Sequence, residues 1–186
     1  MLTLLKIKQS NYDRANESLP PSSPALLTIV GLYKMIVELL WIEEYRMEWG
    51  QLPRGTNFAR FIQTPPTDDQ QEILHTALTY IWDGFIDTFP ILSTALPNEQ
   101  RKLNQEDIGD DKNLILYRPV VQTALIAPLI RRLLDHNNIS FPKSKNEVVK
   151  TLKPLKFIPL DLFDNLWKNF LIILNNEGKY VMRNEQ

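Results

Sequence analysis

The sequence predicts a mainly α protein, with packed helices and, near the C-terminus, a small β-hairpin or short strands. Apolar residues recur at helical spacing over three long segments, at residues 24–46, 68–88 and 119–136. Thirteen prolines stand against six glycines, which indicates helices punctuated by proline rather than a glycine-rich β protein. The hydrophobic fraction of 44% is typical of a globular chain.

The chain is expected to have two parts, because its composition changes near residue 23. Residues 1–23 are predicted to be an N-terminal segment and linker, and residues 24–186 a single helical domain. The first eight residues lack the apolar run and cleavage site of a signal peptide. Cysteine is absent, which excludes disulfides and thiolate zinc sites and is compatible with a reducing compartment. We therefore expect a cytoplasmic protein.

The first long helix is predicted to begin sharply, with Ser23 as its N-cap and Pro24 in its first turn. Between Leu26 and Tyr45 apolar residues occupy almost every side of this helix. Such a helix is either central in a protein core or in a membrane. Two charged residues, Lys34 and Glu38, lie in its middle and favour a buried central helix over a membrane span.

The next helix, at 68–88, can be capped by Thr67 or Asp68. Residues 97–113 are polar and acidic and are expected to form a surface excursion. The short apolar run Leu114–Tyr117 suits a strand. Pro119 then opens the third long helix, which should reach about His136. Pro128 lies inside this helix and is expected to kink it.

Three further elements are predicted near the C-terminus. Residues 144–147, Ser-Lys-Asn-Glu, form a capping box and predict a short helix to about Lys153. Residues 161–167 are expected to form another helix. Residues 170–174 and 179–183 flank a turn that contains Gly178 and favour a hairpin, although one long helix ending at Gly178 is the alternative.

No constellation of residues predicts a catalytic or metal site, so we expect a protein that is not an enzyme and carries no cofactor. The two histidines, His75 and His136, lack ligand partners at metal-binding spacing and are expected to be surface or capping residues. The adjacent carboxylates Glu43 and Glu44 cannot face each other on a helix. No glycine-rich phosphate loop is present in the sequence.

A local basic run predicts contacts with phosphate. Its lysines are opposed only by Glu147, whereas the net charge of the chain is −1. The alternative is an ordinary solvated helix face, and we expect the aromatic residues to belong to the core. The run contains Lys143, Lys145, Lys150, Lys153 and Lys156, and the candidate nucleic-acid-binding residues are Arg131, Arg132, Lys143, Lys145, Lys150 and Lys153.

Arg118 and Gln122 are a second candidate pair, for anion binding. Arg118 precedes the helix that Pro119 opens, and Gln122 lies near its first turn. Both side chains could therefore project around one helix N-terminus, which attracts anions. The alternative is structural, with Arg118 pairing with a carboxylate at the edge of the core and Gln122 capping the backbone.

Three stretches together resemble the C-terminal region of DGQHR-domain proteins, the group that includes the DNA sulfur-modification protein DndB. They are residues 22–34, residues 117–122 (Tyr-Arg-Pro-Val-Val-Gln), and Leu166-Trp167 with the turn at Gly178-Lys179. The resemblance implies a helical region associated with DNA modification and defence. Val121 stands where the family has glycine, and the motif that names the family is absent, so the resemblance transfers no catalytic residue.

The function expected from these observations is that of a non-enzymatic helical module associated with DNA modification or defence. It would act through a protein partner, a missing N-terminal domain, or weak and non-specific contacts with DNA. Two alternatives stay open. One is a small enzyme or nucleotide-binding protein with an unrecognised site, and the other is a purely structural half of a larger protein.

Overall fold

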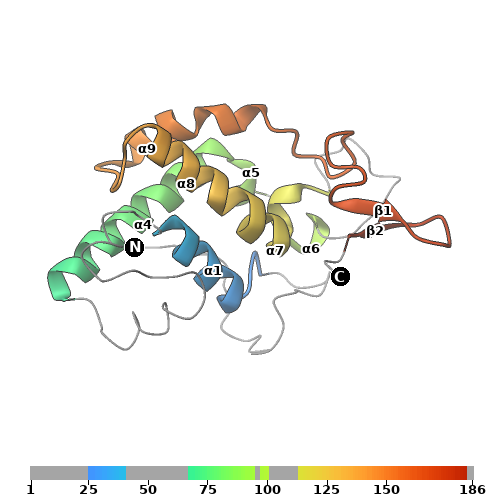
Figure 1. Cartoon of the computed structure of the whole chain (residues 1–186), viewed down its shortest axis with the longest axis horizontal. Coiled ribbons are helices and arrows are strands. Elements are labelled where there is room, and N and C mark those ends of the chain that lie inside the picture. The colour runs from blue at the N-terminus through green and yellow to red at the C-terminus, as the bar shows by residue number, and fades with distance from the viewer. Residues whose placement is uncertain (1–24, 41–66, 95–96, 101–112, 184–186) are drawn as a thin grey trace. The chain divides into compact units, whose positions relative to one another are not determined.

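The computed structural model describes residues 25–40, 67–94, 97–100 and 113–183. These residues are mainly helical and include one two-stranded antiparallel sheet near the C-terminus, so the predicted fold class is confirmed (Figure 1). Predictions for residues 1–23, for 41–46 and for 101–112 fall outside the described residues.

Contacts along the chain divide it into two compact units. Of the described residues, 25–33, 91–94, 97–100, 113–126 and 157–183 belong to the first unit, and 34–40, 67–90 and 127–156 belong to the second. The single domain predicted for residues 24–186 stays a prediction.

The first described helix, α1 (Ile29–Leu39), begins later than Pro24. Ala25 to Thr28 are not helical, and the Thr28 hydroxyl accepts a hydrogen bond from the Gly31 N–H at 2.9 Å. Thr28 thus makes the contact of an N-cap residue, which explains the later start. Met35 and Leu39 are buried, whereas Lys34 is exposed, so only one face of α1 is buried rather than almost every side. Among the described residues, no helix is long and apolar enough to cross a membrane.

Helix α4 (Asp68–Thr88) has the predicted bounds. Thr67 forms a capping box with Gln70: its hydroxyl accepts from the Gln70 N–H at 3.3 Å, and its own N–H donates to Gln70 Oε1 at 2.9 Å. The buried face repeats every three or four residues and comprises Leu74, Ala77, Ile81, Gly84, Phe85 and Thr88. Two four-residue helices follow, α5 (Ile91–Thr94) and α6 (Pro97–Gln100).

The predicted helix at 119–136 is present as three successive helical elements. They are α7 (Pro119–Val121), the π-helical segment η3 (Gln122–Ile126) and α8 (Ala127–His136). Pro128 has no N–H to donate, and its ring crowds the carbonyl one turn earlier. The wider π turn directly before α8 is one of the ways in which a helix accommodates such a defect.

The strand predicted at Leu114–Tyr117 is wrong. Ile115–Tyr117 form a 3₁₀ turn, η2, and Leu114 makes only an isolated bridge with Asp161. All four side chains are buried. A short apolar run signals burial but does not distinguish a strand from a helical turn.

The helix predicted at residues 161–167 is also wrong, because this segment consists of successive turns. The Asp161 carboxylate accepts from the Phe163 N–H at 2.9 Å, and the Asp164 carboxylate accepts from the Leu166 N–H at 2.8 Å. Aspartate side chains that bind the backbone two residues later compete with helical hydrogen bonds.

The C-terminal hairpin is confirmed, and the alternative of one long helix is wrong. Strand β1 (Ile172–Leu174) pairs antiparallel with β2 (Tyr180–Met182), and Ile173 faces Val181 in the register (Figure 1). Gly178 has φ of 73° in the turn, a left-handed conformation that glycine adopts without strain.

Candidate nucleic-acid interface

The predicted basic run folds into helix α9 (Lys145–Leu152) followed directly by the 3₁₀ helix η4 (Lys153–Phe157). Ser144 is the N-cap, and its hydroxyl accepts from the Glu147 N–H at 3.2 Å. The reciprocal bond of a capping box is displaced by one residue, because the Glu147 carboxylate accepts from the Lys143 N–H at 2.7 Å. Glu147 therefore fixes the entry of the chain into α9.

Within the second unit, α9 packs against α4 at a point of very close approach. A Cβ atom added to Gly84 would lie 2.6 Å from Val148 Cγ1 and 2.7 Å from Val148 Cβ. Val148 is fully buried. Only glycine lets the two helices approach this closely, so the contact fixes which face of α9 is turned outward.

Three lysines form a continuous exposed row, which we call the lysine stripe and define as Lys150, Lys153 and Lys156. They are three residues apart, and residues at this spacing lie on the same side of an α-helix or a 3₁₀ helix. The buried side chains of Leu152 and Leu155 alternate with them and attach the segment to the core. The stripe is thus held by packing and presents its charges to solvent.

Lys145 differs from the stripe because it is already paired with an acid. Its Nζ lies 2.7 Å from an Asp87 carboxylate oxygen on α4, and both side chains are about half exposed. The hydrogen bond and the charge of Asp87 raise the pKa of Lys145 above its ordinary value, with a further contribution from Asp83. Lys143 is exposed at the surface before α9.

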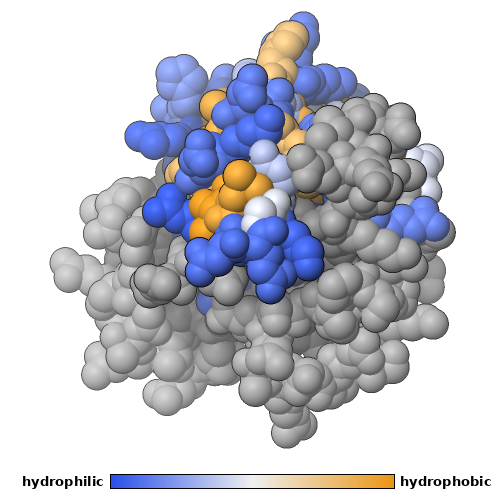
Figure 2. Space-filling view, turned by 90° about the vertical axis from the view of Figure 1, so that its right-hand side faces the viewer, coloured by the Kyte–Doolittle hydropathy of each residue, from blue (hydrophilic) through white to orange (hydrophobic). Residues whose placement is uncertain are grey.

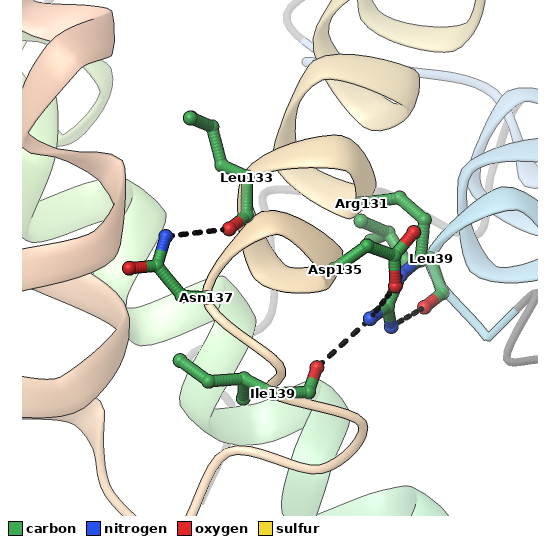
Figure 3. A network of polar contacts seen from close by, with 6 residues as sticks. All are labelled: Leu39, Arg131, Leu133, Asp135, Asn137 and Ile139. Carbon is green, nitrogen blue, oxygen red and sulfur yellow. Dashed lines mark hydrogen bonds and ion pairs between the residues drawn. The ribbon is translucent and has the colours of Figure 1, made fainter.

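Arg131 and Arg132 are adjacent in α8 but have opposite environments. Arg132 is exposed, whereas the Arg131 side chain is 5% exposed. The Arg131 guanidinium donates to the carbonyls of Leu39 (3.3 Å) and Ile139 (2.8 Å) and forms an ion pair with Asp135 (Figure 3). The N–H groups of Arg131 therefore bind α1 and the residues that follow α8, and they stabilise the chain around the end of α8. This placement favours a structural role over the predicted phosphate contact.

The predicted anion-binding pair is also placed inside the protein. Arg118 is 7% exposed and Gln122 is 3% exposed. The Gln122 amide donates to the carbonyl of Leu116 at 2.6 Å and to that of Leu26 at 3.4 Å. The Arg118 guanidinium donates to the carbonyl of Gln100 at 3.4 Å. These bonds favour a structural role for both residues, with Gln122 bonded to the backbone as expected and Arg118 bonded to a backbone carbonyl where a carboxylate was expected.

Both histidines are exposed, His75 on α4 and His136 at the end of α8. In the part of the chain that the structure describes, no group of three or more histidine, cysteine, aspartate or glutamate residues is placed to hold a metal ion.

Sequence reasoning missed Phe157, which it assigned to the core with the other aromatic residues. Phe157 ends η4 directly after Lys156, and it is 83% exposed. Its position among the lysines and between Pro154 and Pro159, outside any apolar helical repeat, is the signal that could have identified it.

Exposed apolar side chains also occur in residues 166–174, which end in β1 and which we call the hairpin segment. The end of the molecule that carries the hairpin shows apolar side chains at its surface among hydrophilic ones (Figure 2). The exposed apolar residues of the hairpin segment are Leu166, Phe170, Ile173 and Leu174. Groups of this kind are typical of surfaces that contact other proteins.

The chain matches no family model, and comparisons with curated proteins and with solved structures likewise find no match.

Proposed function

We propose that the chain is a non-enzymatic helical module that binds nucleic acid weakly and without sequence preference through the lysine stripe. One observation carries this proposal: Lys150, Lys153 and Lys156 are exposed in a single row on a segment anchored by Leu152 and Leu155. The carboxylate nearest in sequence, Glu147, bonds to the backbone before α9. The resemblance of residues 22–34 and 117–122 to DGQHR-domain proteins supports placing the module in DNA modification or defence.

Electrostatics sets the strength of such binding. Each duplex phosphate that a lysine neutralises contributes about 0.9 to the slope of log affinity against log salt, so three contacts give a slope of about −2.7. Three phosphate contacts are few, and we therefore expect micromolar or weaker binding at physiological salt. A protein partner that binds the exposed apolar side chains of the hairpin segment would add the affinity that the stripe does not supply.

The test of this proposal is the variant Lys150→Glu/Lys153→Glu/Lys156→Glu. We expect it to lose duplex binding at about 50 mM salt, because three attractive charges become repulsive. Single Lys→Ala changes should each flatten the salt slope by about one unit. Fluorescence anisotropy with a labelled duplex measures both. Lys145 is left unchanged, because a glutamate there would face Asp87 and disturb the contact between α4 and α9.

Two variants serve as matched controls. Lys179→Glu changes an exposed lysine on the hairpin, outside the stripe, and should leave duplex binding unchanged. Asp87→Asn should instead strengthen binding, because it removes a negative charge and releases Lys145. If the parent chain binds neither a duplex nor a single strand at about 50 mM salt, or if Lys179→Glu weakens binding as much as the stripe variant does, the proposal is wrong.

A further inference from the structure

We infer that the lysine stripe and Phe157 together bind single-stranded nucleic acid, with a base stacked on the Phe157 ring and phosphates held by Lys153 and Lys156. This inference rests on the proposed function and deepens it, because it names the form of nucleic acid that the same site prefers. The observation that carries it is the juxtaposition, in one five-residue helical turn, of a highly exposed aromatic ring and two exposed lysines.

The backbone turn that carries the Phe157 ring is anchored, although the ring itself is exposed. Leu155 is 3% exposed and anchors the middle of η4, while Pro154 fixes one backbone angle next to it. Phe157 therefore projects from a packed turn. An exposed aromatic residue needs no special explanation when it stands alone. Here it follows Lys156 directly, which supplies charge beside an apolar platform.

Proteins that bind single strands use these two features, an aromatic platform and adjacent positive charge. The bases of a single strand are not enclosed in a duplex, so each can place a face on an aromatic ring, while the backbone follows a positive groove or row. Stacking is tolerant of sequence because every base has such a face. A duplex hides these faces and would use only the lysines. The arrangement around η4 therefore favours a single strand over a duplex of equal charge.

The test compares three probes: a 15-nucleotide thymidine strand, an abasic strand of the same length, and a blunt duplex. We expect Phe157→Ala to weaken binding of the thymidine strand roughly 5- to 150-fold, the loss associated with one base–aromatic stack. Its binding to the abasic strand and to the duplex should equal that of the parent. Phe157→Tyr, which keeps an aromatic face, should retain the affinity of the parent for the thymidine strand.

Phe170→Ala is the matched control, because Phe170 is also an exposed phenylalanine, at 62%, but lies next to the hairpin. It should leave binding of the thymidine strand unchanged. Each variant is also checked by thermal denaturation, where changes at exposed positions should shift the free energy of unfolding only slightly.

The outcomes separate this inference from the proposed function. If the parent binds the abasic strand or the duplex as tightly as the thymidine strand, the proposed function survives and stacking is wrong. Unchanged thymidine binding by Phe157→Ala, or an equal loss with Phe170→Ala, would also overturn stacking at Phe157. If the parent binds none of the three probes, both the inference and the proposed function are wrong.

Discussion

Arg131→Ala should lower the free energy of unfolding by about 3 kcal/mol, the loss expected when one buried and one part-buried carbonyl lose a charged donor. Arg131 donates to the carbonyls of Leu39 and Ile139, and no other side chain in Figure 3 is bonded to either of them. Asp135 also loses its partner, but it is 57% exposed and can be hydrated, which limits the added cost. Urea denaturation of the purified chain measures the change.

Arg132→Ala is the matched control for this prediction, because it removes the same side chain from the neighbouring position of α8. Arg132 is exposed, so its removal should change the free energy of unfolding by less than about 0.5 kcal/mol. Equal effects of the two variants would show that Arg131 does not hold the end of α8.

Gly84→Ala should be destabilising by about 1–3 kcal/mol, the range for overpacking a well-packed core. In an open helix this change would be stabilising by about 1 kcal/mol, because alanine favours helix more than glycine does. Here the added Cβ atom would lie 2.6 Å from Val148 Cγ1, so α4 and α9 must move apart. Thermal or urea denaturation determines the sign.

A double variant isolates the cause. Val148→Ala removes Cγ1, the nearer of the two Val148 atoms that the new Cβ would meet, and keeps Cβ, so adding it to Gly84→Ala should recover part of the lost stability. The two changes should therefore be strongly non-additive, as expected for residues in direct contact. Additive losses, or a stabilising Gly84→Ala, would contradict the close approach of α4 and α9.

Elements marked by capping residues and long apolar repeats could be predicted from the sequence. Thr67 and the repeat after it defined α4, and Ser144 with Glu147 located the start of α9. Segments in which side-chain hydrogen bonds or burial override the apolar repeat could not be predicted in this way. Asp161 and Asp164 use their carboxylates to form turns where periodicity favoured a helix, and Leu114–Tyr117 is buried without a strand partner.

In the candidate site, too, some features follow from the local sequence and others depend on contacts between distant segments. The exposure of Lys150 and Lys153 follows from their spacing in a helix, whereas the pairing of Lys145 with Asp87 depends on two helices 58 residues apart in sequence. Arg131 could have been assigned to the interior, because it lies one turn after Ala127 and one turn before Leu134, which are both buried on the same face. Residue type alone could not assign Phe157, whereas its position among lysines and between Pro154 and Pro159 could have marked it as exposed.

The central claim is that the lysine stripe is the surface that contacts nucleic acid. Titration of the ¹⁵N-labelled chain with a short strand at about 50 mM salt, followed by amide chemical shifts, locates the contact directly. The predicted result is that the largest shifts cluster at residues 150–157 and diminish as salt is raised. Largest shifts in the hairpin segment, at residues 166–174, would contradict the claim.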